Sequence, residues 1–324
     1  MKWFDKIIYL IKTFFHKTVY YGLSVASWDL LNSQKRRLGL FADIVNKKKH
    51  SAILRWLTGK FRFFISDFVE RYTETIPLRC DIPEKIWICW WGGIDAMPPL
   101  VRACFNSVNE NTRNNNIHLI TRNNFYEYIS IPEHVINKFD SNIISKTHMA
   151  DILRMALLAE HGGLWLDATV LVTGSIQLKN RCFFTIVNDY GGEYVSKRRW
   201  TGFCIGGTKN NILFEFAKNF YYEYWKECND VIDYFLIDYV IDIAYMSIPG
   251  IKQMIDNVPF NNPNLYVMQD NLGNQVVNGF WDKTCENTIF HKLTWKKNHS
   301  ILTRENNLTL YGYILEKYQI STNN

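Results

Sequence analysis

The side chains best placed for chemistry lie between residues 146 and 169. Asp151 and Arg154 are three residues apart within an otherwise apolar stretch, residues 149–158, so they are neighbours on one face of a helix. A charged pair on a mostly buried helix needs a polar cavity to face. The planar guanidinium suits phosphate or sugar oxygens, and the carboxylate accepts from hydroxyls. The alternative is an ordinary surface ion pair, which contributes little to stability.

A further carboxylate, Asp167, follows a Gly-Gly break and the apolar run Leu-Trp-Leu, which reads as a short buried strand. A carboxylate at such a place is costly unless it is paired or bound to a cation. Magnesium and manganese bind through a few carboxylates together with substrate phosphates. The pattern therefore favours a site for a metal-bound diphosphate. The alternative is an aspartate that caps a turn with the help of Thr169.

The elements around these residues predict an α/β fold. Apolar runs at residues 85–91, 117–121 and 164–166 read as strands, and helices are expected at residues 98–109, 123–129, 132–140 and 145–161. Such alternation implies a mainly parallel sheet flanked by helices. Ligands bind beyond the carboxyl ends of the strands in sheets of this kind. Trp90, Asn123 and Asp167 lie at those ends, where Trp90 could stack on a base; the alternative places Trp90 and Trp91 in the core.

Composition narrows the class of protein. Hydrophobic residues make up 47% and aromatic residues 15% of the 324 residues, which excludes a disordered chain. The seven cysteines show no Cys-x-x-Cys spacing, so we expect reduced thiols, a cytoplasmic setting and no structural zinc. The sequence carries no motif that reads nucleic acid.

The first 80 residues are strongly basic, with 15 Lys and Arg against 6 Asp and Glu. Apolar residues of the segment 3–15 recur at the spacing of one helical face, and lysines take the other side. Charges interrupt the stretch too often for a membrane-spanning helix. We expect a helix in the membrane interface, extended by the clusters 35–37 and 47–49. The alternative is a helix packed on the protein's own core or on a partner subunit.

Taken together, the Asp-x-x-Arg pair, the run Gly-Gly-Leu-Trp-Leu-Asp-Ala-Thr and the strand end Trp-Trp-Gly-Gly resemble the family 32 glycosyltransferases. The branch is that of bacterial capsular polysaccharide synthesis proteins, with more distant similarity to the glucosylating clostridial toxins. The resemblance covers residues 82–180 best and extends to a weaker segment at residues 291–296. It implies a GT-A fold, a divalent metal (Mn²⁺ or Mg²⁺) and transfer with retention of anomeric configuration.

The resemblance also implies roles for the matching residues that would hold the donor. Asp151 and Arg154 would contact the donor sugar and its phosphate as catalytic residues. Trp90 would stack on the base, Asn123 would lie near the nucleoside, and Trp165 would flank the diphosphate.

The implied metal ligands are less complete. Asp167 would be the metal carboxylate, and Thr169 stands where the usual Asp-x-Asp motif has its second aspartate. A hydroxyl is a poorer ligand, so His291 from the C-terminal part is expected to help. Lys292 and Lys296 would neutralise the departing diphosphate, unless their segment is an ordinary amphipathic strand.

The acceptor side is less well marked. No carboxylate stands out as a nucleophile, so we expect front-face attack by the acceptor hydroxyl, whose proton passes to the leaving phosphate oxygen. Asp238 is the candidate catalytic carboxylate on this side, with Trp200 and Asp189 as further candidates. Asp238 could equally be a structural residue of the helix expected at residues 233–246.

The sequence thus predicts a basic helical segment, residues 1–78, and a GT-A domain, residues 79–324, with a nucleotide-sugar half (79–190) and an acceptor half (191–324). The expected enzyme is a hexosyltransferase at the inner face of the cytoplasmic membrane. It would move galactose or glucose from a UDP-hexose to a lipid-linked oligosaccharide. The alternatives are a toxin-like effector that glycosylates a protein and a non-catalytic membrane scaffold that binds a sugar nucleotide.

Overall fold

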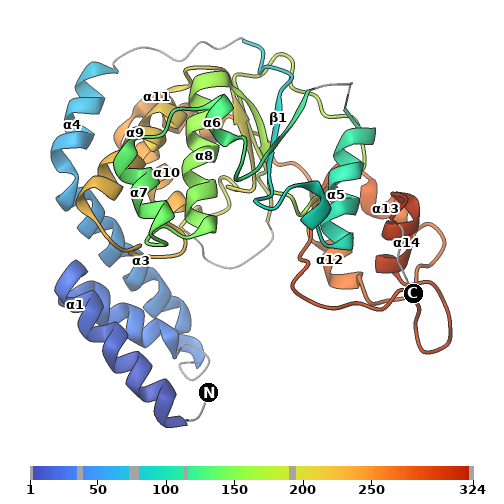
Figure 1. Cartoon of the computed structure of the whole chain (residues 1–324), viewed down its shortest axis with the longest axis horizontal. Helices are drawn as coiled ribbons and strands as arrows, with labels where there is room; N and C mark the ends of the chain where they lie inside the picture. Colours follow the sequence, from blue (N-terminus) through green and yellow to red (C-terminus); the bar gives the residue numbers. More distant parts are fainter. Residues whose placement is uncertain (1–2, 35–38, 73–79, 113–115, 190–194, 321–324) are drawn as a thin grey trace.

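A computed structural model describes residues 3–34, 39–72, 80–112, 116–189 and 195–320 (Figure 1). Its longer helices are α1 (Trp3–Ser33), α3 (Ala42–Lys60), α4 (Arg62–Arg71), α5 (Pro99–Glu110), α7 (Glu133–Asp140), α8 (Lys146–His161), α9 (Ile212–Glu227), α10 (Leu236–Ser247), α11 (Pro249–Asp256) and α14 (Leu310–Lys317). The short helices are η1 (Gly39–Phe41), η2 (Ile94–Ala96), α6 (Phe125–Tyr128), α12 (Val267–Asn271) and α13 (Phe280–Cys285). The strands are β1 (Ile86–Cys89), β2 (Ile117–Ile120), β3 (Gly163–Leu166), β4 (Val170–Val172), β5 (Phe183–Thr185), β6 (Cys204–Gly207) and β7 (Phe290–Lys292).

The main sheet has five strands in the order β2-β1-β3-β6-β5. Strands β2, β1 and β3 are parallel, whereas β6 runs antiparallel to both of its neighbours. Strands β4 and β7 form a separate antiparallel pair. The predicted α/β fold with a mainly parallel sheet is confirmed, and β1, β2 and β3 fall at the expected positions.

Helices cover both faces of the main sheet (Figure 1). Helices α8, α9 and α10 lie on one side, and α5 with α12, α13 and α14 lies on the other. Because side chains alternate along a strand, neighbouring residues of β1 enter different cores. Trp87 belongs to the core with α8 and α9, whereas Ile86 and Ile88 belong to the core with α5.

The boundary between α8 and β3 fixes the direction in which the chain enters the sheet. The Ser145 side chain accepts from the backbone N–H of His148 and so caps the start of α8. The helix ends at Gly162, and both Gly162 and Gly163 have positive φ (66° and 103°), a conformation that glycine adopts at little cost. The predicted Gly-Gly break is thereby confirmed, and β3 follows directly.

The N-terminal helices pack on the rest of the protein. Helices α1 and α3 pack side by side (Figure 1), and α1 is interrupted at Gly22, whose φ of 83° is not helical. The predicted basic cluster 35–37 lies outside the described residues. None of the described helices is long and apolar enough to cross a membrane.

One expectation about the cysteines is corrected. Cys80 and Cys182 form a disulfide across a sequence separation of 102 residues. Short-range spacing gives no sign of a pair so far apart, which is why the sequence failed to predict it. The other five cysteines are free, as expected: Cys89, Cys104, Cys204, Cys228 and Cys285.

A buried ion-pair cluster as the candidate active site

Asp151 and Arg154 meet as their spacing predicts. The Arg154 Nη1 atom donates to Asp151 Oδ1 at 2.8 Å, and the two side chains are 7% and 8% exposed respectively. The pair is therefore buried and not an ordinary surface ion pair. His148, one turn earlier on α8, places its Nδ1 atom 3.6 Å from the other Asp151 oxygen.

Asp167 joins the same cluster from the end of β3. Its Oδ1 atom accepts from Arg154 Nη2 and from the indole of Trp165, both at 3.0 Å. The Arg154 guanidinium also lies over the Trp165 ring, 4.9 Å from the ring centre. One guanidinium thus connects the two aspartates, so the carboxylates from which the sequence predicts a site lie together.

Lys292 reaches the second oxygen of Asp167 from the C-terminal part of the chain. Its Nζ atom lies 2.9 Å from Asp167 Oδ2 and 2.8 Å from Thr169 Oγ1. The β4–β7 register explains the contact, because Val170 pairs with Lys292 directly after Thr169. Phe203 covers the lysine, with its ring centre 4.8 Å from Nζ.

These charges set the protonation states of the cluster. Burial by itself would raise the pKa of Asp167, but the charges of Lys292 and Arg154 outweigh it and hold that pKa well below its usual range. Burial opposes the charge on Arg154, and Asp151 and Asp167 more than restore it, so the Arg154 pKa is raised. Asp167 and Arg154 therefore stay ionised at neutral pH.

Asp238 lies near this cluster, in the first turn of α10. Its Oδ1 atom accepts from the indole N–H of the buried Trp200 at 2.9 Å. Burial raises the pKa of Asp238 to about 6; the Trp200 hydrogen bond lowers it in part, and the negative charge of Asp151 adds to the rise. A carboxylate with such a pKa can exchange protons near neutral pH.

The two tryptophans at the end of β1 point in different directions. Trp90 donates to the Ala96 carbonyl and packs edge-to-face on Trp295, which is 43% exposed. Trp91 packs on Phe139 and donates to the Lys146 carbonyl. Trp91 also lines a cavity of about 570 Å³ at the carboxyl ends of β1 and β2, together with Gly92, Arg122, Phe139, Asp140, Asn142, Ile144, Ser145 and Lys146. A ligand-sized space therefore lies at the edge where the sequence predicts binding.

Three predicted residues do not join the cluster. His291 is fully buried on β7, one residue from Lys292, and its Nε2 atom contacts Thr173 Oγ1 at 3.1 Å. Because neighbouring residues of a strand face opposite sides, it faces away from Asp167, so the structure does not bring this predicted metal ligand to the cluster. Asn123 and Lys296 are exposed, and their backbone N–H groups bond to Thr121 and Thr294.

Two further predicted residues have other contacts. Trp165 is 1% exposed and donates to Asp167, so it holds the carboxylate in place and has almost no surface open to a ligand. Asp189 is largely exposed and lies 4.0 Å from Arg198. Trp200 contacts the candidate catalytic carboxylate directly, because its indole N–H donates to Asp238.

The predicted divalent-metal site does not fit these contacts. Asp167 already accepts from Arg154 and Trp165 on one oxygen and from Lys292 on the other, and Lys292 also occupies Thr169. Within the described part of the chain, no group of three His, Cys, Asp or Glu side chains could hold a metal ion. The ammonium group of Lys292 lies where a cation bound by Asp167 and Thr169 would be.

Sequence reasoning missed several side chains at this edge of the sheet. Tyr234 is 60% exposed; burial raises its pKa, and the charges of Asp151 and Asp167 raise it further. Arg122 lines the cavity beside Trp91, next to the predicted Asn123. The predicted strand, residues 85–91, overlaps β1 but extends two residues beyond its end at Cys89, and the alternation of side chains did not show which of Trp90 and Trp91 faces the cavity.

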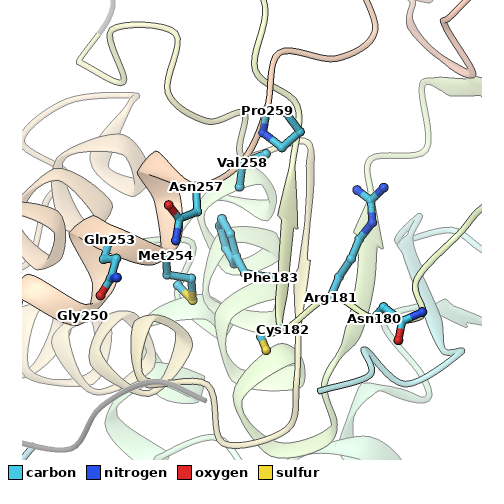
Figure 2. Close-up of a pocket in the computed structure, with 10 residues that line it drawn as sticks. All are labelled: Asn180, Arg181, Cys182, Phe183, Gly250, Gln253, Met254, Asn257, Val258 and Pro259. Carbon is cyan, nitrogen blue, oxygen red and sulfur yellow. The ribbon is translucent and has the colours of Figure 1, made fainter. Parts of the chain in front are cut away.

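A separate cavity of about 370 Å³ lies between α11 and the start of β5 (Figure 2). Gln253, Met254 and Asn257 border it on the α11 side, and Cys182 and Phe183 on the strand side. None of the residues that the sequence predicts for the site lines this cavity. It borders the disulfide and not the charged cluster.

Fold and site together define an α/β protein with a buried cluster of charged side chains at the carboxyl end of its central strand. Residues 39–314 match the family described as capsular polysaccharide synthesis protein. The chain belongs to this family.

The comparison with solved structures gives a distant likeness. One match is "PaToxG Glycosyltransferase", with a TM-score of 0.39, 13% sequence identity, and coverage of 64% of this chain and 83% of that one. No curated protein matches the chain.

Proposed function

We propose that the protein is a glycosyltransferase that moves a sugar from a nucleotide donor to a growing saccharide. Membership of a capsular polysaccharide synthesis family supports a glycosyltransferase role. The observation that carries the proposal is the bridge formed by Arg154 between Asp151 and Asp167 at the carboxyl end of β3. In α/β sheets this is the edge at which ligands bind.

Glycosyl transfer needs groups that stabilise the leaving diphosphate and groups that hold the sugar, and the cluster can supply both. As the bond between the anomeric carbon and the phosphate oxygen breaks, its electron pair leaves negative charge on the diphosphate. Arg154 and Lys292 are fixed cationic donors at this point, and preorganised donors stabilise such charge more than water does. Asp151 supplies an oxygen that could accept from the sugar hydroxyls.

The acceptor reacts on the same face as the leaving group in this proposal. The acceptor oxygen forms the new bond to the anomeric carbon, and its proton passes to the departing phosphate oxygen, so the anomeric configuration is retained. Asp238 lies on the acceptor side and orients the attacking hydroxyl. We place this chemistry in a GT-A domain of the family 32 type, with a UDP-hexose donor and a lipid-linked saccharide acceptor.

A donor screen tests the proposal. The purified chain is incubated with UDP-, GDP- and TDP-sugars and a lipid-linked saccharide acceptor, and released nucleoside diphosphate and elongated acceptor are measured. We expect turnover with one UDP-hexose, stimulated by the acceptor. Release without elongation, but with sugar on an added protein, would favour the toxin-like alternative. Binding of the sugar nucleotide without any release would favour the non-catalytic scaffold.

We further propose that α1 attaches the enzyme to an anionic membrane surface. Its outer face is apolar although it is exposed: the residues of this apolar stripe are Ile8, Ile11, Phe15, Val19 and Leu23, which are 50–80% exposed. Lys12 is exposed on the same side of the helix, four residues from Ile8 and three from Phe15. An amphipathic helix with apolar side chains and lysines is typical of proteins that lie in the membrane interface. The opposite face of α1 packs on α3 through buried residues such as Tyr21 and Val25.

Part of the basic charge points inward. Lys49 is buried and pairs with Asp29 and Asp233, and Lys17 also pairs with Asp29. These two lysines therefore hold α1 and α3 in place and are not available to lipid head groups. The membrane contact that we propose rests on the apolar stripe, with Lys12 as its charged border.

Sedimentation with vesicles tests the attachment. The double variant Phe15→Ser/Val19→Ser should lose binding to vesicles that contain phosphatidylglycerol. The matched control, Phe63→Ser/Met246→Ser, removes two apolar side chains that are each 73% exposed but lie elsewhere, and it should sediment like the wild type. Equal recovery of both variants with the vesicles would refute the proposal.

A further inference from the structure

The ammonium group of Lys292 lies beside Asp167, just after the end of β3. We propose that Lys292 takes the place of the divalent metal expected from the Asp-x-Asp pattern, so that sugar transfer proceeds without a bound metal ion. This inference rests on the proposed function, because it concerns how the same site stabilises the leaving diphosphate. Three features of the cluster support it: the charge balance, the use of the carboxylate oxygens and the fixed position of β7.

Charge balance is the first argument. An Asp-x-Asp motif brings two negative charges, which a divalent cation neutralises. Here Thr169 replaces the second aspartate, so Asp167 alone contributes one negative charge at this point. The single positive charge of Lys292 matches it at 2.9 Å. The two cations Arg154 and Lys292 already balance the two carboxylates Asp151 and Asp167, so a divalent ion at the same place would add two further positive charges beside them, which is unfavourable at such short range.

Coordination is the second argument. A metal ion needs the lone pairs of oxygen ligands, but N–H donors occupy both oxygens of Asp167 and the Thr169 hydroxyl. An ammonium group has three donors, and Asp167 and Thr169 take two of those of Lys292. The third can bind a phosphate oxygen. Lys292 can therefore hold Asp167, Thr169 and the leaving diphosphate together, as a metal ion would.

The position of Lys292 is the third argument. It lies on β7, whose pairing with β4 sets Lys292 opposite Val170. The Lys292 backbone N–H also donates to the Leu265 carbonyl at 2.9 Å. Its side chain is mostly covered, with 20% exposed, and Phe203 packs against Nζ. A lysine held in this way is preorganised, which is what electrostatic stabilisation of a leaving group needs.

In the transfer step Lys292 donates a hydrogen bond and keeps its proton. The bond from the anomeric carbon to the phosphate oxygen breaks, and its electron pair stays on the diphosphate. The acceptor oxygen bonds to the anomeric carbon and releases its proton to that diphosphate. Atoms and charge balance without a metal ion or any other reactant.

Removal of metal from the wild-type chain is the first test. The chain is dialysed against EDTA, and nucleoside diphosphate release from the active donor is measured in EDTA and with Mn²⁺ or Mg²⁺. We expect the rates to agree within about twofold. A rate that falls more than tenfold in EDTA and returns with Mn²⁺ would overturn the inference and leave the proposed function intact. If no donor supports release in either buffer, the proposed function fails, and direct Mn²⁺ binding decides the inference.

Direct Mn²⁺ binding is followed by electron paramagnetic resonance, with and without UDP. Wild-type chain should leave the signal of free Mn²⁺ unchanged beyond the binding by UDP alone. Lys292→Asp restores a second carboxylate beside Asp167, so this variant should gain a saturable Mn²⁺ site. The matched control, Lys283→Asp, makes the same charge change on an exposed residue of α13 and should gain none. Saturable binding by the wild type would contradict the inference whatever the activity.

Conservative variants separate the role in the reaction from a structural role. Lys292→Gln should lower kcat by about 10²-fold, because one preorganised cationic donor is lost. Lys292→Arg keeps the charge and should recover part of that loss. Circular dichroism and thermal unfolding show whether each variant is folded. A folded Lys292→Gln chain with wild-type kcat in EDTA would also refute the inference.

Discussion

At the scale of single residues, the site consists of two aspartates that share one arginine. Asp151 and Arg154 were predictable because a charged pair at helical spacing, within an apolar helix, has to face something polar. The participation of Asp167 followed from its place at a strand end. The contact with Lys292 could not be derived, because it depends on the register between β4 and β7, and these strands are far apart in the sequence.

Asp238 allows a prediction about pH. Its pKa is raised to about 6 by burial, in part offset by Trp200 and supported by the charge of Asp151. If the ionised carboxylate orients the acceptor hydroxyl, the transfer rate should fall about tenfold per pH unit below pH 6. Asp238→Asn should abolish this limb and lower the neutral-pH rate by about 10²-fold. Trp200→Phe should shift the limb to higher pH, because it removes a hydrogen bond that lowers this pKa.

The same pKa shift makes the contribution of Asp238 to the free energy of unfolding decrease as pH rises, whereas the contribution of most carboxylates increases. Because the folded-state pKa is raised, the protonated form favours folding, so its contribution is complete below the unfolded pKa of about 4. It is lost as pH rises through about 6. Urea unfolding of the wild type and of Asp238→Asn across pH 4–7 measures this contribution. The control for the rate prediction is Asp230→Asn, which changes a partly exposed aspartate. The transfer rate of this variant should still fall at low pH, as that of the wild type does.

At the scale of elements, the junction of α8 and β3 brings the site together. A Cβ atom on Gly163 would lie 2.5 Å from the Lys85 carbonyl oxygen, and its φ of 103° strains any other residue. Gly163→Ala should therefore destabilise the fold by about 3 kcal/mol or more. Gly59→Ala is the control, because Gly59 is helical with no atom within 4 Å; it should gain up to about 1 kcal/mol. Equal urea midpoints for the two variants would contradict this role of Gly163.

The disulfide is a second element-level feature. It joins Cys80, just before β1, to Cys182, just before β5, across 102 residues. Closing so long a loop restricts the unfolded chain, so the double variant Cys80→Ser/Cys182→Ser should lose about 2–4 kcal/mol. Cys285→Ser, which removes a free thiol, is the control. A thermal unfolding midpoint of the wild type that does not respond to reductant would show that the bond contributes nothing.

Element prediction succeeded where local signals were strong and failed where tertiary contacts decide. Strands β1 and β3 are apolar runs that stop at, or start from, glycine pairs, and α8 is a long apolar helix with a serine cap. Strand β6, in contrast, contains Gly206 and Gly207, which weaken any strand signal. The backbone of β3 comes so close that a Cβ on Gly206 would lie 2.5 Å from the Gly163 carbonyl oxygen. That close approach explains the glycine, but only the assembled sheet reveals it.

At the scale of the whole molecule, the N-terminal helices join the core that supports the site. Phe61 and Phe68, from the segment expected to stand apart, contact Phe220 and Phe216 of α9. Helix α9 packs on α8, which carries Asp151 and Arg154 (Figure 1). The predicted division into a helical segment, residues 1–78, and a GT-A domain, residues 79–324, stays a prediction. Our proposals give the two ends of this assembly different partners: the outer face of α1 binds lipid, and the sheet edge binds the donor.

The central claim is that the cluster of Asp151, Arg154, Asp167 and Lys292 is the centre of sugar transfer. The most direct test compares nucleoside diphosphate release by the wild type and by Asp167→Asn, with the active donor and acceptor at neutral pH. Asp167 holds both cationic donors in place, so we predict a loss of at least about 10²-fold in kcat, in a chain whose circular dichroism is unchanged. A folded Asp167→Asn chain that transfers sugar at the wild-type rate would contradict the account.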